Sequence, residues 1–250
     1  MLAEIWVVFQ RQMRSLLRNP VWLVFGLMQP VLFLVLFGPL VRNVTGGGLG
    51  GDSTWNIFVP GILLQLVIFG AGFAGFGVIQ ELREGVIDRQ RVTPARRSSL
   101  ILGRTLQNTV TIGVQGVLLV LVAVPLGLRP SWTGVVLAVL LVCLLALGLS
   151  AASYSVGLIL KDEDSFAPIV QGVTLPLMLL SGLILPMSLA PGWLGALSRV
   201  NPLTYTVDGA RALFRGDLAS GDVFWGVVVT AALAALLAAW GTRTFQRSNS

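Results

Sequence analysis

"SWTGVVLAVLLVCLLALGLSAASYSVGLIL", Ser131 to Leu160, is a continuous stretch without a single charged side chain. An α-helix rises 1.5 Å per residue, so about 20 apolar residues cross the roughly 30 Å of hydrocarbon in a lipid bilayer. The stretch exceeds that length. It therefore predicts a transmembrane helix that is long enough to tilt or to project from the membrane.

The sequence contains five more charge-free stretches of spanning length. They run from Val21 to Val41, Ile57 to Ile79, Thr105 to Leu128, Ser165 to about Leu189, and Val223 to Thr242. Prolines at 186 and 191 predict that the fifth helix stops there. We therefore expect an all-α integral membrane protein with six transmembrane helices, forming a single domain over residues 1–250.

The composition agrees with a membrane protein and excludes several kinds of site. Hydrophobic residues make up 55% of the chain and charged residues 11%, against about 25% charged in soluble domains. The absence of histidine excludes Ser-His-Asp catalysis and the H-E-x-x-H zinc motif, and a single cysteine excludes a disulfide framework. The net charge of +6 does not indicate nucleic-acid binding, because the arginines cluster at the ends of apolar stretches.

The basic residues also predict the orientation. If the N-terminus is cytoplasmic, twelve of the 17 Lys and Arg residues fall on the cytoplasmic side and five on the outer side. The positive-inside rule then places both termini in the cytoplasm. At the N-terminus, apolar residues recur at helical spacing, at Leu2, Ile5, Trp6 and Phe9. We expect an amphipathic helix there, within residues 1–20, that lies in the membrane interface.

A charged connector, residues 80–104, would face the cytoplasm between the second and third spans. Glu81, Glu84 and Asp88 fall at i, i+3 and i+7, with Arg83 on another flank. A short helix that Pro94 ends would present them as an acidic face. The mixed signs favour a docking surface for a protein over a lipid-binding basic patch. A solvated loop that only follows the topology rule fits the composition equally well.

Polar and aromatic stripes follow two of the spans. Gln65, Phe69, Phe73 and Phe76 share one face of the second span, and Gln171, Thr174 and Met178 share one face of the fifth. Aromatic stripes on membrane helices commonly face lipid or the core, but an amide is costly in hydrocarbon and favours a functional face. On the third span, Asn108, Thr111 and Gln115 predict hydrogen bonds between helices. The small pairs Gly70/Ala74 and Ala71/Gly75 predict a close helix contact.

The chain shows no energy source of its own. None of the six charge-free stretches holds Asp, Glu, Lys, Arg or His, whereas ion-coupled transporters keep such residues in the membrane. The glycine-rich segment from Thr45 to Asp52 lacks the Gly-Lys-Ser/Thr ending of a phosphate-binding loop. A partner must therefore power any transport.

The segment "LSGLILPMSLAPGWLGALSRVNPLTYTVDGARALFRG", Leu180 to Gly216, resembles the type-2 ATP-binding-cassette (ABC) transporter permeases, in particular the daunorubicin-resistance branch. The resemblance rests on Ser181-Gly182, Pro186, Pro191-Gly192-Trp193, Asn201-Pro202-Leu203-Thr204-Tyr205, Asp208 and Arg211. The connector is similar to the family's segment between spans two and three, through Arg83-Glu84, Thr93-Pro94, Arg97 and Gly103-Arg104. At Gly209 the sequence departs from the family, which often has a bulkier residue there.

The resemblance implies a permease subunit of an ATP-driven exporter in the bacterial plasma membrane. Such a permease pairs with a second copy or a sister permease and with separate ATP-binding subunits, which bind ATP and Mg; this chain would bind no cofactor. Coupling to the ATPase is then expected at Glu81, Arg83, Glu84 and Asp88.

The resemblance also implies an outer re-entrant segment and a route for cargo. Residues 186–221 would form short helices that dip into the outer leaflet, with the motif Asn201, Pro202, Tyr205, Asp208 and Arg211. Asn201-Pro202 fits a helix start, and Asp208 and Arg211 are spaced to pair. The family's route between paired permeases follows spans one, two and five. It would include Gln29, Gln65, Phe69, Phe73, Phe76, Gln171, Thr174 and Met178.

Uncharged spans with aromatic residues suit a hydrophobic or amphipathic small molecule, such as a drug or antibiotic. The alternative within transport is a permease for lipid-linked polysaccharide. An integral membrane enzyme that modifies lipids would need a catalytic cluster. Tyr205, Asp208 and Arg211 give it little support without histidine or an activated nucleophile. A passive channel would conduct without nucleotide.

Overall fold

The computed structural model describes residues 2–19, 21–45, 54–84, 97–183, 187 and 190–247. Across these residues the regular structure is helical and no strand occurs, as the sequence predicts. The helices are α1 (Leu2–Arg18), α2 (Val21–Thr45), α3 (Thr54–Gly72), α4 (Gly75–Arg83), α6 (Arg97–Ala123), α7 (Trp132–Leu160), α8 (Glu163–Leu180), α9 (Gly192–Ser198), α10 (Pro202–Arg215) and α11 (Gly221–Arg247).

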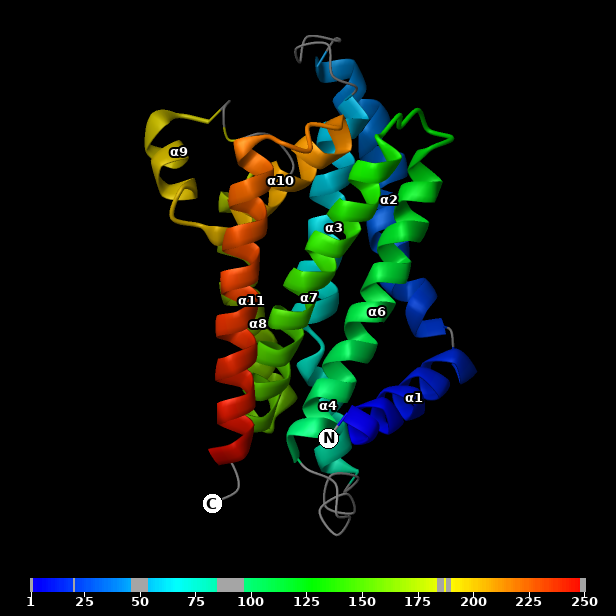
Figure 1. The fold of residues 1–250 in the computed structure, drawn as a ribbon, viewed down its shortest axis with the longest axis vertical. Helices are drawn as coiled ribbons and strands as arrows, with labels where there is room; N and C mark the ends of the chain where they lie inside the picture. The colour runs from blue at the N-terminus through cyan, green and yellow to red at the C-terminus, as the bar shows by residue number, and fades with distance from the viewer. Residues whose placement is uncertain are drawn as a thin grey trace.

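The long helices lie side by side along the long axis of the molecule (Figure 1). Both chain termini, α4 and the transverse helix α1 lie at one end, which we call the terminal end. Helices α9 and α10 lie at the other, which we call the opposite end. Helix α7 packs against α3, α6, α10 and α11. Its glycines permit this: a Cβ on Gly148 would lie 2.6 Å from Cα of Ala234 in α11.

Four segments are long and apolar enough to cross a membrane, namely Trp55–Arg83, Ile101–Ala123, Trp132–Leu160 and Gly221–Thr244. The pair α1 and α2 adds a fifth if the two helices, bent by 70°, count as one broken span. Helix α8 is not among these segments. Its 18 residues begin with Glu163 and Asp164 and include two prolines, which lower its apolar content. The described residues therefore support four to five of the six expected spans.

The second span is broken, whereas the sequence predicted one continuous helix from Ile57 to Ile79. Helix α3 ends at Gly72 and α4 begins at Gly75. Ser153 of α7 inserts at the break, where its Oγ donates to the carbonyl of Gly72 and accepts from the backbone N–H of Gly75. A side chain that replaces helical hydrogen bonds in this way is a known cause of kinks. A Cβ on Gly75 would lie 2.5 Å from the Ser153 carbonyl, so the predicted close contact is confirmed.

The fifth span also differs from the prediction, because α8 ends at Leu180 rather than near Leu189. Gly182 adopts a φ of +69°, a left-handed conformation that stops the helix before the prolines. The contact that fixes this turn comes from α3. A Cβ on Gly61 would lie 2.0 Å from the carbonyl oxygen of Leu183, so only glycine permits this approach.

The helices run past the charge-free stretches, which themselves hold no charged residue. The segment Trp55–Arg83 includes Glu81, and Ile101–Ala123 includes Arg104. These two side chains form an ion pair with each other across α4 and α6. Paired charges near a helix end escape most of the penalty for an isolated charge.

Two predicted helix starts are confirmed. Helix α1 runs over Leu2–Arg18, within the predicted residues 1–20, and packs on α6, where a Cβ on Gly103 would lie 2.7 Å from Val8. Helix α10 begins where Asn201-Pro202 predicted. The Asn201 side chain accepts a hydrogen bond of 3.0 Å from the N–H of Leu203, and Pro202 occupies the first turn.

Candidate functional site

At the terminal end, Glu81 belongs to an internal polar network. Its carboxylate accepts hydrogen bonds from Arg104 and, at 3.3 Å, from the Gln12 side chain of α1. Arg104 is 7% exposed. A further hydrogen bond of 2.7 Å, from Ser99 Oγ to Glu4, joins α6 directly to α1. Three segments that are distant in sequence are thus held together here, and Glu81 faces the protein rather than a solvated acidic face.

Arg83 lies on the exposed surface of the same end. Its guanidinium is within 3.4 Å of Asp162 and 3.3 Å of Glu163, in the connection from α7 to α8. Asp162 also caps α8, and its hydrogen bonds from the Ser165 hydroxyl and N–H lower the pKa of its carboxyl. Asp162 and Glu163 were not among the predicted site residues. The sequence carries a signal for them, because the positive-inside rule counts the adjacent Lys161 on the same side as the charged connector.

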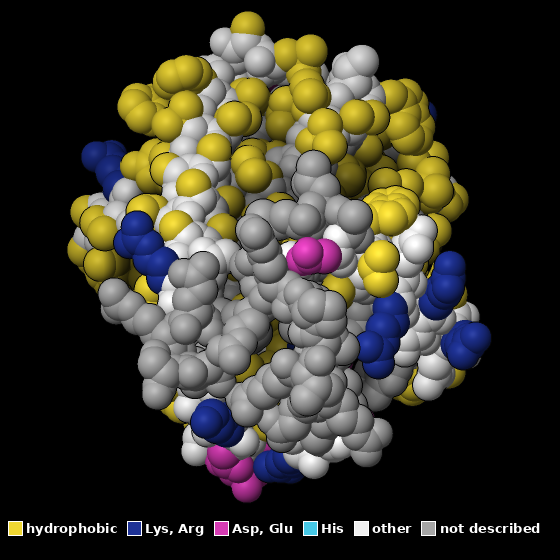
Figure 2. All heavy atoms as spheres, turned by 60° about the horizontal axis from the view of Figure 1, so that its bottom comes forward, with side chains coloured by type: hydrophobic (Ala, Val, Ile, Leu, Met, Phe, Trp, Pro, Cys, Tyr) yellow, Lys and Arg dark blue, Asp and Glu magenta, His cyan; other side chains and the backbone are white. Residues whose placement is uncertain are grey.

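Glu84 is exposed and accepts a hydrogen bond of 3.0 Å from Gln80. Asp88 and Pro94 lie outside the described residues, as does the rest of the connector from 85 to 96. Figure 2 looks onto this end, where basic and acidic side chains gather below a flank covered by hydrophobic ones. The exposed cluster Arg83, Glu84, Asp162 and Glu163 is therefore a polar surface at the end of an apolar body.

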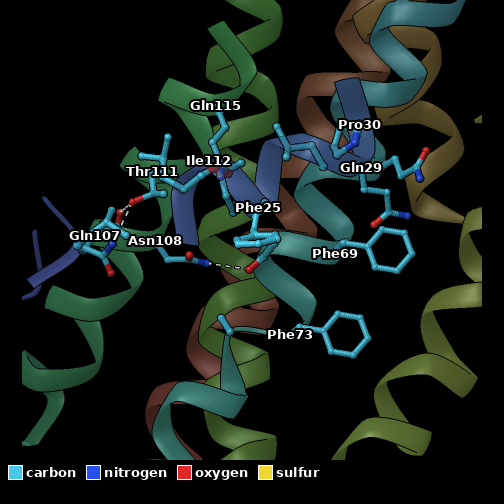
Figure 3. A pocket seen from close by; sticks show the side chains of 17 residues that line it. Phe25, Gln29, Pro30, Phe69, Phe73, Gln107, Asn108, Thr111, Ile112 and Gln115 are labelled. Carbon is cyan, nitrogen blue, oxygen red and sulfur yellow. Dashed lines mark hydrogen bonds between the residues drawn. The ribbon is translucent and has the colours of Figure 1, made fainter. Parts of the chain in front are cut away.

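A cavity of about 540 Å³ lies between α2, α3 and α6 (Figure 3). This volume falls within the range of small-molecule sites. One wall is aromatic, with Phe25, Phe69 and Phe73, and the α6 wall carries polar side chains, among them Asn108 and Gln115. None of the 17 lining residues is charged.

The cavity brings together half of the residues predicted for the cargo route, namely Gln29, Gln65, Phe69 and Phe73. The other four lie elsewhere. Phe76 packs edge-on against Phe166 of α8, with 4.9 Å between the ring centroids. Gln171, Thr174 and Met178 on α8 do not line the cavity. Thr174 is buried, Met178 packs against the core, and Gln171 is exposed.

The predicted hydrogen bonds of the third span are confirmed for two of the three residues. The amide of Asn108 donates to the Gly70 carbonyl at 3.3 Å and to Ser150 Oγ at 2.9 Å, which joins α6 to α3 and α7. The amide of Gln115 donates to the Leu23 carbonyl of α2 at 3.0 Å. Thr111 instead bonds within α6, to Gln107. All of them also line the cavity, which the sequence did not indicate.

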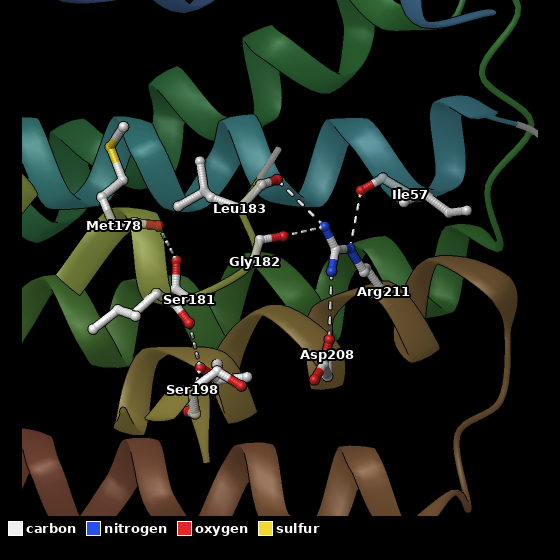
Figure 4. Close-up of polar contacts among 10 residues, drawn as sticks. Ile57, Met178, Ser181, Gly182, Leu183, Ser198, Asp208 and Arg211 are labelled. Atoms are coloured by element: carbon white, nitrogen blue, oxygen red, sulfur yellow. Dashed lines mark hydrogen bonds and ion pairs between the residues drawn. The ribbon is translucent and has the colours of Figure 1, made fainter. Parts of the chain in front are cut away.

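At the opposite end, Arg211 of α10 joins three segments (Figure 4). It is 3% exposed and donates to the carbonyls of Ile57, Gly182 and Leu183 at 3.1, 2.7 and 3.3 Å. The predicted pair with Asp208 is present at 3.4 Å. The other motif residues are also placed: the amide of Asn201 donates to the Leu177 carbonyl, and the Tyr205 hydroxyl donates to the Arg199 carbonyl.

Gly209 of α10 has a packing role. A Cβ at this position would lie 3.2 Å from Cα of Gly226 in α11 and 3.1 Å from the Asp222 carbonyl. A Cβ on Gly226 would in turn lie 2.8 Å from the Tyr205 carbonyl. The two glycines face each other and let α10 and α11 cross closely, and α10 is helical throughout.

Comparison with known proteins identifies the family of this chain. The model of the ABC-2 type transporter family matches residues 3–214. The chain is 25% identical over its whole length to a daunorubicin resistance ABC transporter permease protein of Streptomyces coeruleorubidus, covering 87% of that protein. It is 27% identical to the inner membrane transport permease YadH of Escherichia coli K12, over 86% of this chain and 85% of that protein.

A permease of Mycobacterium tuberculosis named for doxorubicin resistance is 23% identical, over 88% of this chain and 80% of that protein. Relatives named for resistance to these two drugs support the daunorubicin-resistance-like branch. Members of the family are permease subunits of transporters rather than catalytic enzymes. Because the family match covers most of the sequence, the chain belongs to the ABC-2 type transporter family.

Proposed function

We propose that this chain is the membrane subunit of an ATP-driven exporter that moves hydrophobic or amphipathic, drug-like molecules out of the cell. The observation that carries the proposal is the exposed polar cluster of Arg83, Glu84, Asp162 and Glu163 at the terminal end of an otherwise apolar bundle. Separate ATP-binding subunits, which hold ATP and Mg, would dock there. Asp88 would extend the same surface.

The proposed arrangement in the membrane has six spans. Helices α2 and α8 supply the first and fifth spans beside the four that meet the criteria of length and composition. The terminal end faces the cytoplasm of a bacterial cell, with α1 in the membrane interface. Helices α9 and α10 form the re-entrant segment on the outer side. Exposed Trp193 and Leu197 on α9 support contact with the outer leaflet.

The proposed cargo follows from the named relatives and from the lack of charge along the bundle. Two of the family members are named for daunorubicin and doxorubicin resistance. None of the residues that line the cavity is charged. Gln29, Gln65, Phe69 and Phe73 would line the route within each permease. Exposed Gln171 on α8 would lie nearer a second permease, whereas Thr174, Met178 and Phe76 pack within this chain.

Copurification and transport together test the proposal. The tagged chain, expressed with the genes next to its own, is expected to copurify with an ATP-binding subunit. Proteoliposomes of that complex are expected to export a lipophilic drug only when ATP is present. Copurification without drug export, together with loss of a surface polysaccharide on gene deletion, would instead support the polysaccharide alternative. Turnover of lipid by the purified chain alone would contradict both.

A further inference from the structure

The cavity between α2, α3 and α6 has a polar side chain without a partner. Gln65 is 5% exposed and lines the cavity, yet it forms no hydrogen bond with any residue that the structure describes. The neighbouring amides of Asn108 and Gln115 bond to protein carbonyls and hydroxyls. The amide of Gln65 is accessible to the cavity, so a ligand there can form a hydrogen bond with it without displacing a protein partner.

The rest of the lining restricts the chemistry of that ligand. The rings of Phe25, Phe69 and Phe73 offer faces for an aromatic body, and Phe69 stacks on Phe73 with 6.0 Å between centroids. Figure 3 shows these two rings extending to the same side. None of the lining residues is charged, so the cavity offers no counter-charge to a charged ligand. Moving such a ligand out of water into the cavity would be costly.

We infer that this cavity is a binding site inside a single permease for an uncharged aromatic amphiphile that carries a hydrogen-bond donor such as a hydroxyl group. The amide oxygen of Gln65 accepts the specific hydrogen bond, and the phenylalanine rings hold the aromatic body. The site is separate from a route between paired permeases, because Gln171, Thr174 and Met178 do not line it. Its role in export rests on the proposed function; its ability to bind does not.

A phospholipid fits this cavity less well. Its head group carries a phosphate, and no Lys or Arg is among the lining residues to neutralise it. Its two acyl chains also exceed a cavity of about 540 Å³, which suits one drug-sized molecule.

Photoaffinity labelling of the purified chain in lipid nanodiscs, without any ATP-binding subunit, tests this inference. The probe is 4-(hydroxymethyl)benzophenone, which is uncharged and aromatic and carries one hydroxyl. Its adducts, mapped by mass spectrometry, are expected on the stretches 23–30, 65–74 and 107–115. The comparison probes are 4-methylbenzophenone, which keeps the ketone but has no hydrogen-bond donor, and 4-benzoylbenzoate, which is charged. After correction for membrane partitioning, both are expected to label these stretches about tenfold less, the factor that one hydrogen bond represents.

The variant Gln65→Leu removes the amide and nearly keeps the volume of the side chain. Labelling by the hydroxymethyl probe is expected to fall about tenfold, while labelling by the methyl probe stays unchanged. The matched control is Gln80→Leu, which removes an exposed amide outside the cavity and leaves labelling unchanged. If Gln65→Leu does not fold, Gln65→Asn, which retracts the amide by one methylene, replaces it and is expected to lower labelling by the same probe.

Equal labelling by the three probes, or adducts outside these stretches, would overturn the inference. So would unchanged labelling in the folded Gln65 variant. A copurifying phospholipid that blocks the probe until it is removed would show that lipid is the occupant. These outcomes are distinct from failure of the proposed function. A chain that exports nothing can still be labelled, and an exporter that is not labelled here retains its ATP-dependent transport.

Discussion

Two arginines are buried near opposite ends of the molecule, and they are stabilised in different ways. Arg104 at the terminal end pairs with the carboxylate of Glu81 across two helices. Arg211 at the opposite end donates mainly to backbone carbonyls, and its one carboxylate partner, Asp208, is 46% exposed. Arg104 is neutralised by a carboxylate, and a double variant can remove both charges together. Arg211 donates to backbone carbonyls, which remain in place whatever residue replaces the arginine.

The carbonyls that Arg211 binds explain this dependence. Gly182 and Leu183 follow the end of α8, where carbonyl groups no longer have partners within the helix. Ile57 belongs to α3, so the same guanidinium fixes the turn after α8 against a second helix. A planar group with five N–H donors can serve three carbonyls and a carboxylate together, which no other side chain can do.

The largest expected effect is at Arg211. We expect Arg211→Leu to lower the free energy of unfolding by about 3 kcal/mol or more, because buried carbonyls lose their donor. Arg211→Lys should recover little, since an ammonium cannot reproduce the fork of donors. Unfolding in detergent micelles, followed by circular dichroism, measures both. The control is Arg215→Leu, whose side chain is more exposed and pairs with Asp217. Equal losses for Arg211→Leu and Arg215→Leu would contradict the role given to Arg211.

A smaller net effect is expected at Arg104 when both charges are removed. Glu81→Leu alone should cost about 3 kcal/mol, because it removes the carboxylate that neutralises a buried guanidinium. The double variant Glu81→Leu/Arg104→Met should regain most of that loss. The matched double variant Asp208→Leu/Arg211→Leu should regain none of the stability that Arg211→Leu loses, because the backbone carbonyls stay without a donor. A double-mutant cycle at each end measures the difference, and similar recovery at both ends would remove the distinction.

The smallest effect on stability is expected at the exposed ions of the terminal end. Arg83→Ala and Glu84→Ala should change the free energy of unfolding by no more than about 0.5 kcal/mol, because exposed ion pairs contribute little. Under the proposed function, both should lower the amount of drug exported per ATP hydrolysed while the ATP-binding subunit still copurifies. Arg243→Ala, another exposed arginine at the same end, is the control and should leave transport unchanged. Normal coupling in Glu84→Ala would argue against this surface.

Much of the fold could be predicted from the sequence. The helical class, the position of α1 and the start of α10 follow from length, hydropathy and residue spacing, which act locally. The break at Gly72–Gly75 could not be predicted, because it depends on Ser153, 78 residues further along the chain from Gly75. The early end of α8 could not be predicted either, since it depends on a close contact between Leu183 and Gly61.

The candidate sites divide in the same way. Spacing placed Gln65, Phe69 and Phe73 on one face, and they do line one cavity. Spacing could not show that the α6 amides form the facing wall, or that Phe76 turns to Phe166 after the break. It grouped Glu81 with Glu84 as one acidic face, whereas Glu81 pairs internally with Arg104.

The sequence by itself determined that this protein is an apolar helical body with its charges at the ends, because the cost of charge in hydrocarbon acts on every residue independently. The tertiary structure alone decided which charges are internal, where helices break and which side chains share a cavity. Those outcomes depend on contacts between helices that are distant in sequence. A partner such as Ser153 or Arg211 becomes visible only when the helices are packed.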